Sequence, residues 1–148
     1  MAGVQEGQII RLDEGVQLEV LYAGSSGGSD NDSSVVLRLS YGAFSLLLTG
    51  DGELAAELAM VASGTSLASL VLKAGHHGAR TSSNEFFLAA VQPQVVVVSS
   101  GAGNTVGHPH PEVLERIARR GAAVLRTDEL GTITAISDGQ QLWWETRR

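Results

Sequence analysis

The sequence predicts an α/β fold in which helices cover a parallel or mixed β-sheet. Two observations lead to this prediction. From residue 44 to residue 121, short apolar runs of strand length alternate with segments of helical periodicity. Two strand pairs with turn signals between them precede that region, and further short strands follow it. The chain has 148 residues and 43% hydrophobic residues, so we expect one domain, residues 1–148, with a core of its own.

Four strands are expected before the first helix. The segment GQIIRLDEGVQLEVLYAG reads as two strands around a tight turn at residues 13–15, and VVLRLSYGAFSLLLTGD reads as two more around residues 41–43. Residues 24–34, GSSGGSDNDSS, should form a polar loop between the pairs. The run FSLLL at residues 44–48 is continuously apolar, so we expect it to be buried on both faces of the sheet.

Three helices and the remaining strands follow. GELAAELAMVAS has apolar residues at helical spacing. Ser82 and Glu85 have the spacing of a capping box, which predicts that a second helix begins there. HPEVLERIARRG has Pro111 in its first turn, arginines in its last turn and Gly121 after its end, all features typical of a helix. LASLVLKAG and QVVVVSSG are the buried strands between these helices, and a hairpin at residues 138–139 is expected in the tail.

Composition excludes several classes of function. The chain has no cysteine, so disulfides, thiol catalysis and cysteine-based metal sites are excluded. The net charge is −6, which does not suit a protein that binds nucleic acid through a basic surface. A polyanionic substrate would need a local positive site such as a metal ion. No apolar run approaches the roughly 18 residues of a membrane span. The first residues, MAGVQEGQ, lack a basic and an apolar region, so we expect no signal peptide.

Candidate functional side chains follow three consecutive predicted strands. They are Asp51 after FSLLL, His76 and His77 after LASLVLKAG, and Asn104, His108 and His110 after QVVVVSSG. Ligands of such sheets bind at the carboxyl ends of the strands, so we expect these side chains at one edge of the sheet. Carboxylate together with imidazole is the ligand mixture of zinc, manganese and iron hydrolytic sites.

Each of these residues also has a structural interpretation. Asp51 precedes a predicted helix and is a candidate for its N-cap. His76 and His77 could form a structural pair, because adjacent histidines lack the i, i+4 spacing of a helical zinc motif. For His108 and His110, a turn that leads into the following helix is the favoured explanation.

Two other motif matches lack residues or neighbouring structure that the motif requires. Asp30, Asp32 and Ser34 have the first spacings of an EF-hand loop, but Val35 stands where glycine is needed and Tyr41 where the bidentate glutamate is needed. Residues 24–28 match G-x-S-x-G, but no helix is expected directly after them, as a nucleophile elbow would require.

Three segments together resemble the metallo-β-lactamase-type domain of ComEC-family competence proteins, which take up DNA in bacteria. The segments are SDNDSSVVLRLSYGAFSLLLTGD, LKAGHHGARTSS and VVVVSSGAGNTVGHPHPEVLERI. The resemblance implies an αββα fold built from two similar halves, the first of which supplies an H-x-H-x-D-H motif. That motif is absent here, since the first histidine is His76. The chain therefore resembles the second half of a metallo-β-lactamase-like fold, a mixed sheet with flanking helices.

The resemblance implies roles for five residues. Asp51 matches the family aspartate that follows L-L-T-G and bridges two metal ions. Either imidazole of the His-His-Gly motif fits the later metal histidine; we favour His77, which leaves His76 to face the substrate as an acid or phosphate contact. Asn104 and His108 match N-x-x-G-H-P, which we expect to shape the substrate loop or to support the ligands. Without the H-x-H-x-D-H cluster, no complete two-metal site is expected within this chain.

The resemblance implies that a longer parent protein hydrolyses DNA with two divalent ions, zinc or manganese. The isolated chain is expected to be inactive. Its expected partners are DNA, the missing N-terminal half-domain and a membrane channel domain, and the parent is expected in the bacterial cell membrane with this domain extracytoplasmic. Two alternatives remain: a non-catalytic structural or interaction module of a DNA-uptake transporter, and another hydrolase of this fold acting on a phosphoester or lactone. A missing half also predicts an exposed apolar edge or face of the sheet.

Overall fold

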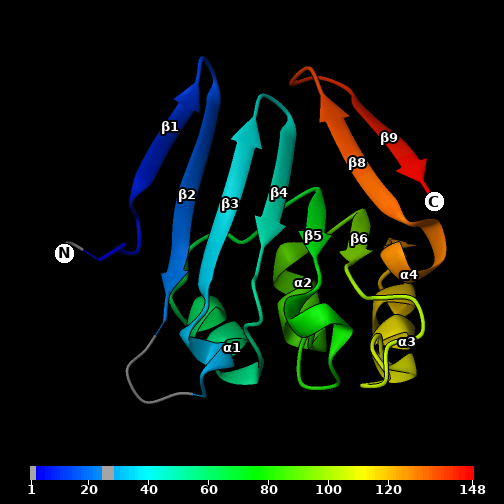
Figure 1. The fold of residues 1–148 in the computed structure, drawn as a ribbon. Helices are drawn as coiled ribbons and strands as arrows, with labels where there is room; N and C mark the ends of the chain where they lie inside the picture. The colour runs from blue at the N-terminus through cyan, green and yellow to red at the C-terminus, as the bar shows by residue number, and fades with distance from the viewer. Residues whose placement is uncertain (1–2, 25–28) are drawn as a thin grey trace.

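The computed structural model describes residues 3–24 and 29–148 and confirms the predicted α/β architecture with a mixed sheet (Figure 1). Residues 25–28, with most of the G-x-S-x-G match, and residues 1–2 lie outside the described part. The main sheet contains β1 (Ile9–Asp13), β2 (Val16–Ala23), β3 (Val35–Tyr41), β4 (Phe44–Leu48), β5 (Val71–Lys73), β6 (Val95–Val98) and β7 (Ala123–Arg126). The hairpin contains β8 (Thr132–Ser137) and β9 (Leu142–Arg147). The helices are α1 (Leu54–Ala62), α2 (Glu85–Val91), α3 (Pro111–Arg119) and α4 (Thr127–Leu130).

The strands of the main sheet lie side by side in the order of the sequence. Strands β1 to β4 pair antiparallel, which confirms both predicted hairpins at residues 13–15 and 41–43. Strands β4 to β7 pair parallel, and one helix connects each strand to the next. Because parallel strands end at the same edge, the segments that follow β4, β5 and β6 are brought together there.

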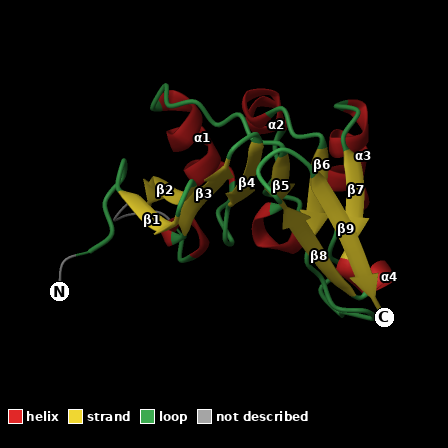
Figure 2. Ribbon diagram, turned by 90° about the horizontal axis from the view of Figure 1, so that it is seen from above, coloured by secondary structure: helices red, strands yellow, loops and turns green. Residues whose placement is uncertain are grey.

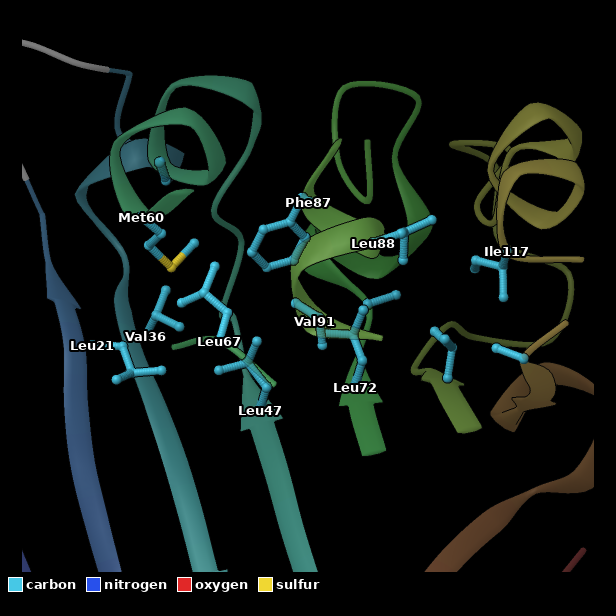
Figure 3. Close-up of a cluster of buried hydrophobic side chains, with 14 of the residues drawn as sticks. Leu21, Val36, Leu47, Met60, Leu67, Leu72, Phe87, Leu88, Val91 and Ile117 are labelled. Atoms are coloured by element: carbon cyan, nitrogen blue, oxygen red, sulfur yellow. The ribbon is translucent and has the colours of Figure 1, made fainter. Parts of the chain in front are cut away.

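Helices α1, α2 and α3 lie on one face of the sheet and bury it (Figure 2). The core between helices and strands is aliphatic apart from a few residues, among them Phe87 of α2 (Figure 3). Leu47 of β4 and Leu72 of β5 are completely inaccessible and point toward the helices within this core, with Leu72 next to Val91 of α2. Burial of a side chain of this size stabilises the folded state by about 1.5–3 kcal/mol. The alternate residues of the strands point to the opposite face.

The opposite face of the sheet is also apolar but is only partly covered. The β8–β9 hairpin crosses it, and its tip is held where the amide of Ala43 donates to the carbonyl of Gly139 at 2.6 Å. A cavity of about 380 Å³ remains between the hairpin and the sheet, with Leu46 and Leu48 on one wall and Trp144 on the other. The prediction that residues 44–48 are buried on both faces is therefore wrong in part: Leu46 and Leu48 are only half-buried, because the hairpin is the single layer above them among the described residues.

An apolar row runs across the antiparallel strands of this face. Register pairs Ile10 with Leu18, Leu18 with Leu39, and Leu39 with Leu46, and side chains of paired residues point to the same side of a sheet. Ile10 is 36% exposed and the three leucines are half-buried. We call these four residues the open-face row. The expected exposed apolar surface is thus a face of the sheet.

The beginning of α2 differs from the predicted capping box. The hydroxyl of Ser82 donates to the carbonyls of Gly75 and Ala79, at 2.6 and 3.0 Å, instead of capping the helix. The N-cap residue is Asn84, and the buried carboxylate of Glu57 in α1 accepts hydrogen bonds from the amides of Ser83 and Asn84. A carboxylate from another helix thus supplies the acceptor that local spacing assigned to Ser82.

Candidate metal centre

Asp51 lies at the carboxyl end of β4 and does not cap α1. The N-cap position of α1 belongs to Glu53, whose side chain makes no capping hydrogen bond. Asp51 does not take part in the cap: its amide donates to the hydroxyl of Ser34 at 3.1 Å. The carboxylate of Asp51 is 46% exposed and lies beside His77. The N-cap interpretation of Asp51 is therefore wrong.

The two adjacent histidines lie in a strained turn after β5. His76 and His77 both have positive φ, 42° and 55°, in the left-handed region that β-carbons disfavour. Gly75 is required because a β-carbon there would lie 2.5 Å from the carbonyl oxygen of Gly52. Gly78 is required because its φ is +81° and a β-carbon would meet Pro109 at 2.7 Å. Glycines on both sides thus allow the turn to present two imidazoles at one strand end, and such strain is typical of functional sites.

The imidazole of His77 is fixed with one nitrogen free. Its Nδ1 lies 2.6 Å from the carbonyl oxygen of Ser99, which can only accept, so Nδ1 carries the proton. In the neutral ring, Nε2 then has a lone pair, and it lies 3.5 Å from Oδ1 of Asp51. Two ligand atoms that share a tetrahedral ion with bonds of about 2.1 Å stand about 3.4 Å apart. The donor atoms of Asp51 and His77 therefore fit a divalent cation, and their predicted convergence is present.

His76 is held by a carboxylate that sequence reasoning did not identify. Its Nδ1 lies 2.7 Å from Oε1 of Glu53, which also accepts a hydrogen bond from the hydroxyl of Thr81 at 2.7 Å. Burial raises the pKa of the Glu53 carboxyl, but the hydrogen bonds from Thr81 and His76 outweigh it and lower the pKa overall. Glu53 thus orients His76 and directs its Nε2 away from the carboxylate. Local sequence contains no signal for this contact, because Glu53 reads only as the start of a helix.

Asp32 supports the position of Glu53 through hydrogen bonds at the beginning of α1. Its side chain is buried and accepts hydrogen bonds from the amides of Glu53 and Ala56 and from the hydroxyl of Ser29. Burial raises the pKa of Asp32, and these hydrogen bonds together lower it below its usual value. The acidic loop therefore anchors the beginning of α1, and with it Glu53.

Asn104 closes the loop after β6. Its side-chain amide donates to the carbonyls of Gly101 and His108, at 3.0 and 2.7 Å, and its oxygen accepts from the amide of His108 at 3.0 Å. Asn104 therefore shapes the loop and uses its polar atoms to do so.

The rings of the four histidines in the chain form a row of successive edge-to-face contacts. The ring centroid of His76 is 6.2 Å from that of His77 and 5.4 Å from that of His108, and His110 follows at 5.4 Å from His108. The structural interpretation holds for His110, which occupies the N-cap position of α3. It is incomplete for His108, which lines a cavity together with His77. Burial, followed by repulsion from the other histidines, lowers the pKa of His108.

Asp51 and His77 form a pair of candidate ligands. Within residues 3–24 and 29–148, no group of three or more His, Cys, Asp or Glu side chains is placed to hold a metal ion. In the same part of the chain, no helix is long and apolar enough to cross a bilayer. The structure thus defines a mixed α/β protein with a carboxylate and an imidazole at the ends of adjacent strands.

The chain is homologous to segments of known bacterial competence proteins. It is 37% identical over 131 residues to ComE operon protein 3 of Bacillus subtilis, 44% over 105 residues to competence protein ComA of Neisseria gonorrhoeae, and 39% over 105 residues to recombination protein 2 of Haemophilus influenzae. These alignments cover 88%, 70% and 71% of this chain. They cover only 17%, 15% and 13% of the relatives, so the chain spans about a sixth of their length or less. No family model matches the chain.

Proposed function

We propose that the chain is the second half of a metallo-β-lactamase-like domain in a DNA-uptake protein, and that the complete domain hydrolyses phosphodiester bonds of DNA. The observation that carries this proposal is the Asp51–His77 pair, whose donor atoms stand 3.5 Å apart with Nδ1 of His77 already engaged by Ser99. The homology to competence protein ComA supports the biological setting. The extracytoplasmic position of the domain and its attachment to a membrane channel domain belong to the same proposal.

The proposed chemistry divides between the cation site and His76. Zinc or manganese ions, when bound, would supply an activated water and neutralise charge on the phosphate. Asp51 and His77 would hold a cation on one side of the phosphate. His76 lies next to them with Nδ1 donating to Glu53, so its Nε2 carries a proton only in the imidazolium form. In that form Nε2 can donate a hydrogen bond to a phosphate oxygen or pass its proton to the leaving group, which leaves the ring neutral. Its orientation by a carboxylate resembles the support that ligating and catalytic histidines commonly receive.

The open-face row supports the presence of a partner half. Both faces of the sheet are apolar in their central strands, yet helices cover only one of them. A second sheet packed on the open face would bury the row and bring its own strand ends toward Asp51 and His77. The remaining metal ligands would come from that half.

The test compares the chain with a longer protein that includes the preceding half. Given DNA and Mn²⁺, the 148-residue chain should show no cleavage above the His77→Ala background, since it holds only part of the ligand set. The longer protein should bind Mn²⁺ and cut DNA, and both properties should be lost in Asp51→Ala and His77→Ala. Cleavage by the short chain that depends on Asp51 and His77 would contradict the half-site proposal.

The open-face row also favours a second candidate, a non-catalytic interaction module. In that case the longer protein would use the apolar face for assembly, and DNA uptake would survive Asp51→Ala while failing after Leu39→Asp. Loss of uptake in both variants supports the hydrolase. Activity of the longer protein on a simple phosphoester or lactone, but not on DNA, would favour another hydrolase of this fold.

A further inference from the structure

A cavity of about 410 Å³ opens beside the Asp51–His77 pair. His77 forms part of its wall, the strand-end residues Ser99 and Gly101 form another part, and Val106 and His108 of the following loop complete it. The volume falls within the range of about 300–1,000 Å³ that small-molecule sites have. The cavity is therefore large enough for a ligand that extends from the Asp51–His77 pair toward the loop.

Two polar groups in this wall have no protein partner. Within residues 3–24 and 29–148, neither the hydroxyl of Ser99 nor a ring nitrogen of His108 makes a hydrogen bond, although both residues are half-buried. Other polar groups nearby are already used: Ser100 donates to Asp128, and Asn104 closes the loop. Half-buried donors without partners are available to a ligand, and a phosphate oxygen is a suitable acceptor.

The rest of the wall is apolar and open. The side chain of Val106 is 65% exposed at the rim, and no atom lies within 4 Å of the position that a β-carbon of Gly101 would take. A ligand here can therefore approach the backbone at Gly101 and cover Val106. Donors next to an apolar wall, adjoining a cation site, match the phosphate and the sugar or base of one nucleotide. An imidazole such as that of His108 can also stack on a base.

We propose that this cavity binds the nucleotide that adjoins the scissile phosphate, with His108 and Ser99 donating to its phosphate and Val106 and Gly101 contacting its nucleoside. The proposal rests on the proposed function, since that function places the scissile phosphate at Asp51 and His77. The proposal makes His108 a substrate-binding residue, a role that its position in a turn before α3 does not indicate.

Nuclear magnetic resonance of the ¹⁵N-labelled 148-residue chain tests the proposal without metal and without turnover. Thymidine 5′-monophosphate should shift the amide signals of Ser99, Gly101 and Val106 with a dissociation constant of about 1 mM. Thymidine and inorganic phosphate, added separately, should each produce a weaker response. His108→Ala and Ser99→Ala should each weaken binding about fivefold, as expected for the loss of one hydrogen bond. His110→Ala is the matched control, because it removes an imidazole of the same loop that does not line the cavity.

Three results would overturn the proposal: no saturable response to thymidine monophosphate, a response no stronger than that to inorganic phosphate, or equal binding by wild type, His108→Ala and Ser99→Ala. The amide spectrum itself shows whether each variant is folded. Manganese binding and DNA cleavage by the longer protein are separate measurements. If they depend on Asp51 while the cavity binds no nucleotide, the proposed function stands and this inference fails.

Discussion

Nε2 of His77 lies 3.5 Å from Oδ1 of Asp51, at the ends of two adjacent parallel strands. Because Ser99 engages the other ring nitrogen, two electron-pair donors face each other in the neutral form of the ring. Such an arrangement suits a cation between the two donor atoms. We propose that this pair forms part of a metal site.

Metal binding by the isolated chain should be weak and should depend on this pair. Two protein ligands leave most of the coordination shell to water, so we expect dissociation constants for Zn²⁺ and Mn²⁺ that are micromolar or weaker. Calorimetry should show that Asp51→Ala and His77→Ala abolish the remaining binding, while His110→Ala retains it. Submicromolar binding that Asp51→Ala removes would mean that the chain contains further ligands.

Replacement of Glu53 should release His76 without unfolding the protein. In Glu53→Ala, Nδ1 of His76 loses its carboxylate acceptor, while the side-chain amide of Asn31 remains 3.3 Å away as a donor. The Nδ1-protonated tautomer should therefore lose its preference. Ring ¹⁵N chemical shifts of His76 measure this directly, and the shifts of His77, whose acceptor is the carbonyl of Ser99, should change little. Thr81→Ala, which removes a different donor to Glu53, is the control. An unchanged His76 spectrum in Glu53→Ala would show that the carboxylate does not orient the ring.

The glycine before the histidine pair should be intolerant of a β-carbon. In Gly75→Ala the new methyl group would lie 2.5 Å from a backbone oxygen of Gly52, which cannot move without shifting the segment between β4 and α1. We expect a loss of about 2–4 kcal/mol in the free energy of unfolding. Gly101→Ala, where the structure has no atom within 4 Å, should change that free energy by less than about 0.5 kcal/mol. Urea denaturation compares the two, and equal stabilities would contradict the close packing of the turn.

Acid stability should depend on Asp128, which links β7 to the segment after β6. The hydrogen bond from Arg126 holds the pKa of Asp128 below its usual value of 3.8, with a smaller contribution from Ser100. As the pH falls through 3.8, the unfolded chain therefore takes up this proton before the folded chain does. The stabilisation is complete above that pH and is lost as the pH falls through the folded-state pKa.

The measurement is urea denaturation at a series of pH values. Wild type should lose more stability than Asp128→Asn between pH 5 and the folded-state pKa of Asp128, the range in which linkage acts. Arg126→Gln should reduce this difference, because it removes the largest cause of the lowered pKa. Parallel curves for wild type and Asp128→Asn would rule out the ion pair as a source of acid sensitivity.

The sequence by itself determined the elements and their order. Apolar periodicity and turn residues predicted the strands of both hairpins, the three long helices and the hairpin at residues 138–139, because these signals are local. Alternation of strand and helix then required that the segments after β4, β5 and β6 meet at one edge, which brought Asp51 and His77 to one place.

Only the tertiary structure decided which groups hold the site in place. Glu53 orients His76, Glu57 replaces the predicted cap at Ser82, and His108 joins the cavity of His77. Each contact joins residues far apart in the chain, and local spacing does not specify which individual side chains of different elements will meet. Burial of FSLLL was overestimated for the same reason: how far a second face is covered depends on what packs against it.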